Sequence, residues 1–211
     1  YLEKPILDFH RFLQVISKNL EIMEKERELK ELRARVTRLN QLQHEPGHNE
    51  LIGNSPAMRA LRETIQQVGP LRVPVLVVGE SGVGKERVSR VLHATSGVKG
   101  PFLAINCAGL QKDLLESELF GHEAGAFTGA ERTKQGLCEV AGSGTLLLDE
   151  IGELPFEMQA SLLRVLHERE FRRVGGTRTM PLTARIVSAT NVDLRQAITD
   201  RRFREDLYYR L

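Results

Sequence analysis

Tryptophan is absent from the sequence, and only two of its 211 residues are cysteines, Cys107 and Cys138. Their separation matches no metal-binding spacing, so the pattern favours small buried thiols in a reducing cytosol. No apolar run approaches the ~20 residues of a membrane-spanning helix, and no signal peptide opens the chain. These absences exclude a membrane protein and predict a cytoplasmic location.

An excess of charge of one sign is also missing, since 30 basic residues face 28 acidic ones. This balance gives no reason to expect nucleic acid or membrane surfaces as partners of this segment. The length suits one nucleotide-binding domain with an appendage. Because the chain starts without methionine and stops at Leu211, directly after a patterned helix, we expect it to be a piece of a longer protein.

The N-terminal region carries a helical pattern with two different periods. Apolar spacing over residues 6–16 indicates one helix, and a heptad pattern follows from about residue 15 to 42. The seam positions are Val15, Ile22, Leu29 and Val36, with Lys18, Lys25, Leu32 and Leu39. The pattern favours a parallel two-stranded coiled coil, and a single solvated charged helix is the alternative. Pro46 and Gly47 then break the helix.

Beyond residue 46 the pattern changes to alternating helices and continuous apolar strands, which is typical of a parallel sheet covered on both faces. Strands are expected over 73–78, 102–106, 144–149 and 184–190. Helices are expected over 55–68, with Ser55 as N-cap, and over 85–96, 111–120, 156–168 and from 193 onward. The helix over 156–168 should turn Met158, Leu162, Leu163 and Leu166 inward.

A phosphate-binding loop follows the first of these strands. Residues 79–86 fit the pattern GxxxxGK, in which glycines let backbone N–H groups wrap phosphate and the lysine reaches the β- and γ-phosphates. The expected ATP-binding residues are Gly79, Glu80, Ser81, Gly82, Val83, Gly84, Lys85 and Glu86. A glycine-rich turn is the alternative. Glu86 stands where serine or threonine usually binds Mg²⁺, so metal binding must depend on other groups.

Polar side chains end three of the other strands. Asp149 is suited to hold Mg²⁺. Glu150 is suited to polarise the attacking water and is also expected as a metal ligand. Two helix-capping acids are the alternative. Asn191 after Thr190 would face the γ-phosphate unless it only caps a turn, and Asn106 could hydrogen-bond Glu150.

Two further features stand apart from the strands. Arg204 and Arg210 would serve as arginine fingers if a neighbouring subunit supplied them, although by spacing alone they are ordinary surface arginines. The hexapeptide GAFTGA, with one phenylalanine and one threonine between glycines, suits a loop that projects and touches a partner. Its residues are Gly125, Ala126, Phe127, Thr128, Gly129 and Ala130.

These motifs together resemble the AAA+ ATPase domain of bacterial enhancer-binding proteins, the NtrC class of sigma-54 transcription activators. The likeness covers residues 50–211, and its most specific part is ELFGHEAGAFTGA at 118–130. The family's own loop is GESGVGKE, so Glu86 fits it. Residues 144–155 and 203–211 also match. The resemblance implies an AAA+ domain over 46–211 that hydrolyses ATP with Mg²⁺ and acts as a ring of six or seven subunits.

The resemblance also implies roles for particular residues. Residues 125–130 would contact sigma-54, chiefly through Phe127 and Thr128, and the loop near 170–179 would support them. Asn106 would be the glutamate switch, Asn191 or Thr190 the sensor, and Arg204 with Arg210 the trans-acting fingers. Ile52 and Gly53 would lie beside the adenine.

The wider protein implied by the resemblance is a two-component response regulator. Residues 1–16 resemble the end of a receiver domain, which would answer to a sensor histidine kinase, and 17–45 would be the linker of an inactive dimer. A fifth sheet strand, a helical lid and a domain that binds enhancer DNA would follow Leu211. Two alternatives compete with a sigma-54 activator: a regulator that does not hydrolyse ATP, and an AAA+ unfoldase or loader with another client.

Overall fold

The computed structural model describes residues 51–211, which belong to one compact unit. The expected receiver remnant (1–16) and coiled-coil linker (17–45) lie outside the described residues and stay predictions. Within 51–211, no helix is long and apolar enough to cross a membrane. Cys107 and Cys138 are buried free thiols, and burial raises the pKa of each to about 12.

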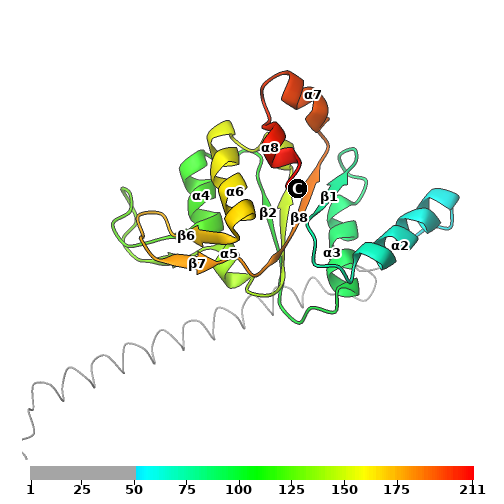
Figure 1. Cartoon of the computed structure of the whole chain (residues 1–211), viewed down its shortest axis with the longest axis horizontal. Helices are drawn as coiled ribbons and strands as arrows, with labels where there is room; N and C mark the ends of the chain where they lie inside the picture. Colours follow the sequence, from blue (N-terminus) through cyan, green and yellow to red (C-terminus); the bar gives the residue numbers. More distant parts are fainter. Residues whose placement is uncertain (1–50) are drawn as a thin grey trace, which may run out of the picture. The chain divides into compact units, whose positions relative to one another are not determined.

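A four-stranded parallel sheet forms the centre of the unit (Figure 1). Its strands, in order across the sheet, are β1 (Val75–Val78), β8 (Arg185–Thr190), β5 (Thr145–Asp149) and β2 (Phe102–Asn106). β5 and β8 occupy the middle and are almost entirely buried, which explains their unbroken apolar runs. The predicted parallel sheet is therefore confirmed.

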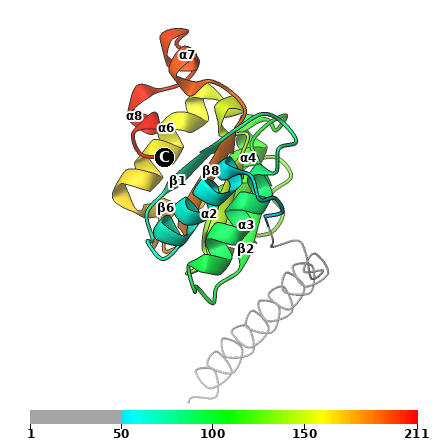
Figure 2. The same ribbon diagram turned by 90° about the vertical axis from the view of Figure 1, so that its right-hand side faces the viewer.

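Helices cover both faces of this sheet (Figures 1 and 2). On one face lie α2 (Pro56–Val68) and α3 (Lys85–Thr95), and on the other α4 (Lys112–Phe120) and α6 (Phe156–Glu168). Side chains alternate between the faces along each strand. The core cluster under α2 and α3 contains Ile65, Leu92, Phe102, Leu147, Val187 and Ala189.

Local sequence signals fix several helix boundaries. α2 begins as predicted, with Pro56 at its first position and the Ser55 hydroxyl accepting a hydrogen bond from the Met58 N–H (3.3 Å). The inward face of α6 differs in one place from the prediction, because Leu163 is only half-buried and Val165 is buried in its stead. Val165 continues the i, i+4, i+7 series that Met158 and Leu162 begin.

The remaining elements are short, and most of them carry no repeating pattern from which they could be predicted. They include two antiparallel hairpins at one end of the unit. These elements are β3 (Gly121–His122), β4 (Lys134–Gln135), α5 (Leu137–Val140), the 3₁₀ turn Ile151–Glu153, β6 (Glu170–Arg172), β7 (Thr179–Pro181), α7 (Leu194–Thr199) and α8 (Glu205–Tyr208).

Arg185 at the start of β8 fastens α2 to the sheet. Its side chain is 1% exposed, and its guanidinium donates to the carbonyl oxygens of Val68, Gly69 and Val73. The first two carbonyls belong to the end of α2, where a cation also complements the helix dipole. This clamp places α2 against α3, whose N-terminus follows the phosphate-binding loop.

Replacing Arg185 by methionine is expected to lower the free energy of unfolding by about 3 kcal/mol, because three carbonyl oxygens lose a charged donor. Urea denaturation followed by circular dichroism measures this change. The matched control is Arg72→Met, since Arg72 is exposed and donates to a single carbonyl, that of Ser143, among the described residues. Equal losses in both variants would contradict the assigned role of Arg185.

Candidate functional site

The four strands end at the same edge of the sheet. The register places Val78 of β1 beside Thr190 of β8, and Asn106 of β2 beside Asp149 of β5. Because the carboxyl ends of parallel strands form the binding edge of an open α/β sheet, the predicted polar side chains gather there. The candidate site is built on this edge.

The phosphate-binding loop leaves β1 and enters α3. Gly82 and Gly84 have φ values of 79° and 96°, which only glycine adopts readily, and α3 begins at Lys85 directly after them. The Gly79 N–H donates to the Thr190 carbonyl (3.1 Å), which ties the start of the loop to the neighbouring strand. Strand, loop and helix N-terminus therefore follow one another in the order that was predicted for a phosphate-binding loop.

Lys85 is buried beneath this loop, with 7% of its surface exposed. Its ammonium group donates to the carbonyl oxygens of Gly79 (3.0 Å) and Glu80 (3.1 Å). The same Nζ lies 3.5 Å from Oε1 of Glu150. The lysine thus joins the loop to the acidic strand end. Glu80, Ser81 and Val83 are on the exposed side of the loop.

Glu86, in the position of the usual hydroxyl residue, is turned to its own helix. Its carboxylate accepts from the Arg90 guanidinium at 2.7 and 3.0 Å, one turn further along α3. Glu86 is exposed. An i, i+4 pair of this kind stabilises the first turns of the helix modestly.

Asp149 and Glu150 stand at the end of β5. Asp149 is half-buried, and burial followed by the Glu150 charge raises the pKa of Asp149 above its usual value, although the Glu150 N–H and Lys85 act in the opposite direction. Glu150 adopts a left-handed conformation (φ 51°), which is uncommon for a residue other than glycine. Its side chain caps no helix.

Instead, the Glu150 carboxylate is held between two neighbours. Lys85 lies beside Oε1, and the backbone N–H of Asn191 donates to Oε2 (3.2 Å). Asn106 lies at the same edge, and its side-chain oxygen accepts from the Ala108 N–H (2.8 Å). Among the described residues, its amide N–H groups donate no hydrogen bond to Glu150. The partners of Glu150 are therefore Lys85 and the end of β8, whereas the sequence suggested Asn106.

The sensor candidates differ in their surroundings. Thr190 is fully buried, and its hydroxyl accepts from the Val192 N–H (3.0 Å). Asn191 is exposed directly after it. Of the two, Asn191 has the accessible side chain at the sheet edge, whereas Thr190 shapes the turn that presents it.

The two candidate fingers lie near the C-terminus of the described chain. Arg204 precedes α8, and its guanidinium forms a two-point ion pair with Asp206 (3.0 and 2.8 Å). Its backbone N–H donates to the buried Gln159 side chain of α6 (2.8 Å). Arg210 is exposed. Neither arginine is recorded in contact with Lys85 or the β5 carboxylates in the part of the chain described.

The segment predicted to lie beside adenine precedes α2. Ile52 is 78% exposed, and Gly53 has a φ of 133°. Arg62 of α2 donates to the carbonyls of Leu51 and Gly53 (2.6 Å for the latter), so the helix holds this segment in place. An exposed isoleucine on a fixed backbone is a suitable surface for a flat base.

The GAFTGA hexapeptide forms the tip of the β3–β4 hairpin. The Gly125 N–H donates to the Ala130 carbonyl (2.7 Å), which closes the loop, and both Gly125 and Gly129 have positive φ values. Ala130 is buried at the base, whereas Phe127 and Thr128 are exposed at the tip. A closed neck with an exposed tip matches the projecting loop that was expected.

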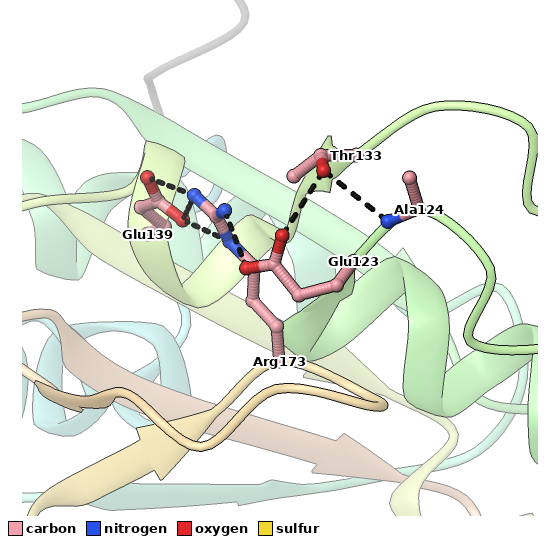
Figure 3. Close-up of polar contacts among 5 residues, drawn as sticks. All are labelled: Glu123, Ala124, Thr133, Glu139 and Arg173. Carbon is pink, nitrogen blue, oxygen red and sulfur yellow. Dashed lines mark hydrogen bonds and ion pairs between the residues drawn. The ribbon is translucent and has the colours of Figure 1, made fainter.

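A cluster of charges joins this hairpin to the β6–β7 hairpin and α5 (Figure 3). Arg173 donates to Glu139 of α5 (2.8 Å) and to Glu123 at the base of the GAFTGA loop (3.0 Å). Glu123 also accepts from the Thr133 hydroxyl (3.0 Å), which itself accepts from the Ala124 N–H. The Thr133 hydrogen bond and then Arg173 lower the pKa of Glu123. The cluster thus clasps the neck of the loop.

Backbone contacts bring the two hairpins still closer. The Val174 N–H donates to the Gly121 carbonyl (2.9 Å), and the Glu123 N–H donates to the Val174 carbonyl (3.0 Å). A Cβ on Gly175 would meet that of Ala126 at 2.8 Å. The loop expected to give support therefore lies against the hexapeptide. Sequence reasoning did not identify Arg173, Glu123 or Glu139, because the three lie on separate segments with no shared motif.

Comparison with known proteins places these features in a family. A profile of the family described as "Sigma-54 interaction domain" matches residues 51–211. The regulatory protein AtoC of Escherichia coli K12 is 45% identical over 212 aligned residues, covering 100% of this chain and 44% of AtoC. The Nif-specific regulatory protein of Rhodobacter capsulatus is 54% identical over 162 residues, covering 76% of this chain and 28% of that protein.

Solved structures agree with this relation. Crystal structures of NtrX from Brucella abortus in complex with ADP and with ATP are each 39% identical to this chain, with TM-scores of 0.72 and 0.70. Each alignment covers 100% of this chain and 44% or 45% of NtrX. The chain thus spans less than half the length of AtoC and of NtrX. With its central parallel sheet flanked by helices and a family match that spans every described residue, the chain belongs to the sigma-54 interaction domain family.

Proposed function

We propose that this chain is the ATP-hydrolysing part of an activator that remodels the closed promoter complex of sigma-54 RNA polymerase. The observation that carries the proposal is the joint presence of a contact between Lys85 and Glu150 beside the loop 79–86 and an exposed GAFTGA tip. The family match and the nucleotide complexes of NtrX support it. A regulator that does not hydrolyse ATP would not need the Lys85–Glu150 pair. An AAA+ unfoldase or loader with another client would not need the GAFTGA tip.

The chain's residues suit hydrolysis of a nucleoside triphosphate. The loop 79–86 would bind the β- and γ-phosphates through its N–H groups, and Lys85 would exchange its carbonyl partners for phosphate oxygens. Glu150 would accept a proton from the attacking water, and Asn191 would orient the γ-phosphate. The Lys85–Glu150 contact of 3.5 Å supports this assignment, because the proposed base and the proposed phosphate ligand lie side by side.

The donor set at this edge fits Mg²⁺. Within 51–211 no three acidic, histidine or cysteine side chains cluster as a metal cage. One or two carboxylates with phosphate oxygens and water form the usual magnesium environment, and Asp149 with Glu150 supplies the carboxylates. Bound there, Mg²⁺ would neutralise charge that develops on the phosphates.

The whole protein is proposed to work as an oligomer that answers to a signal. Arg204 and Arg210 would complete the nucleotide site of a neighbouring subunit in a ring of six or seven, and an inactive form would be a dimer. A sensor histidine kinase would control assembly through a receiver domain, and a separate domain would bind enhancer DNA. AtoC and the DctD regulator of Pseudomonas aeruginosa, both 45% identical over the full chain, support this assignment as named regulators.

Thr128→Ala is expected to leave ATP hydrolysis within about twofold of the parent but to weaken sigma-54 binding by at least about tenfold, because an exposed contact at the centre of an interface is lost. The measurement is co-elution of the chain with sigma-54 in the presence of ADP and a γ-phosphate mimic. Thr64→Ala, which changes an exposed threonine of α2, is the matched control.

Two results would contradict the proposal at different points. Normal co-elution of Thr128→Ala would overturn the role of the GAFTGA tip in binding. Failure of the parent chain to co-elute, despite measurable ATP hydrolysis, would leave an AAA+ ATPase with a different client.

A further inference from the structure

We propose that the side chain of Phe127 docks against the ring of His122. This contact would keep the GAFTGA tip docked until nucleotide binding moves α4. The ring of Phe127 meets the ring of His122 edge-on, with centroids 5.0 Å apart and planes at 68°. This geometry is one that aromatic pairs prefer. The proposed effect of this contact on sigma-54 binding rests on the proposed function, whereas the docking of Phe127 on His122 does not.

The exposure of Phe127 is consistent with docking. Phe127 is 42% exposed, so part of its ring is covered while the rest stays open to solvent. The polar clasp of Arg173, Glu123 and Thr133 fixes the neck of the loop through hydrogen bonds among these three residues. His122 therefore supplies a hold on the tip that is separate from the clasp at the neck.

Ser117 of α4 orients the histidine. Its hydroxyl shares a hydrogen bond with Nδ1 of His122 (2.7 Å), and the serine is only 2% exposed, so it is fixed in the packing of the helix. His122 itself is half-buried in β3, directly after α4 ends. The plane of the imidazole thus follows the position of α4.

α4 also begins close to the nucleotide edge. Asn106 ends β2, its side chain binds the Ala108 N–H, and α4 starts at Lys112. A shift of Asn106 toward Glu150 would pull on this connection and hence on the Ser117–His122 pair. We infer that His122 is a positioning residue that converts the movement of α4 into release of Phe127.

The absence of tryptophan from this chain gives a direct test. Phe127→Trp introduces the only indole, whose quenching by acrylamide reports how well the tip is shielded. In that background, His122→Ala is expected to lower the ratio of docked to undocked loop by about two- to tenfold, as loss of one aromatic pair predicts. Quenching should rise accordingly, and Ser117→Ala should raise it less.

Two controls separate docking from general disruption of the hairpin. His122→Phe keeps an aromatic ring without the hydrogen bond to Ser117, so it should restore shielding. His167→Ala removes an exposed histidine of α6 and should change nothing. Unchanged quenching in His122→Ala, or a rise that His122→Phe fails to reverse, would overturn the proposal.

A second measurement relates docking to the partner. If His122 restrains the tip, His122→Ala should bind sigma-54 without the γ-phosphate mimic more strongly than the parent does. If the parent binds sigma-54 and His122→Ala binds it equally strongly without the γ-phosphate mimic, the restraining role of His122 is contradicted. The quenching experiment contains neither nucleotide nor sigma-54, so failure of any chain to bind sigma-54 would count against the proposed function alone.

Discussion

Replacing Arg204 by alanine is expected to lower ATP turnover in the assembled ring by about a thousandfold or more, the range measured for arginine fingers. The reason is that a guanidinium supplied by the neighbouring subunit would stabilise charge on the transferred phosphoryl group. Arg204 is well anchored for this role, because its backbone is fixed by buried Gln159 and its side chain by Asp206. Binding of ATP should be largely preserved.

A mixing experiment tests whether the finger acts between subunits. Arg204→Ala subunits lack the finger but keep Glu150, whereas Glu150→Gln subunits lack the base but keep the finger. Each variant alone should be nearly inactive, and mixed rings should regain part of the turnover. The matched control is Arg202→Ala, since Arg202 forms a similar ion pair with Asp200 two residues away. Absence of recovery in mixed rings would contradict a finger in trans.

Glu150→Gln alone is expected to lower turnover by about a hundredfold to ten-thousandfold while the chain still binds ATP, because an amide cannot accept the proton of the attacking water. The substitution keeps the shape of the side chain and both neighbours, Lys85 and the Asn191 N–H. Phosphate release measures turnover, and a fluorescent ATP analogue measures binding.

Glu153→Gln is the control for this prediction, since Glu153 is an exposed carboxylate in the same 3₁₀ turn. It should leave turnover unchanged. Retained turnover in Glu150→Gln would remove the assignment of Glu150 as general base. Loss of ATP binding in Glu150→Gln would instead show that Glu150 is needed for the structure of the ATP-binding pocket.

The central sheet was predictable because burial leaves a clear trace in sequence. β5 carries an unbroken apolar run up to Asp149, and β2 and β8 end in the polar residues that mark the same edge. A strand of two or three residues has no such trace, which is why the two hairpins were not predicted. The inward face of α6 was predicted except at Leu163, because two adjacent leucines leave the rotation of a helix undecided.

The sequence indicated candidate site residues where these follow one another along the chain. The phosphate-binding loop, the β5 carboxylates and GAFTGA are contiguous motifs. The contacts of Arg173 with Glu123 and Glu139 depend on tertiary packing between distant segments, and no spacing rule reports them. The contact between Glu150 and the Asn191 N–H was not predicted for the same reason, since a backbone N–H has no residue-type signature.

The order of the strands makes the middle of the sheet more rigid than its edges. β5, with the carboxylates, is bonded on both sides, whereas β2, which leads to α4, pairs only with β5 within the described residues. A displacement of β2 therefore strains one ladder, but a displacement of β5 would strain two. The proposed hydrolysis would therefore take place on the more rigid part of the sheet, and the proposed movement of α4 would begin at an edge strand that resists displacement less.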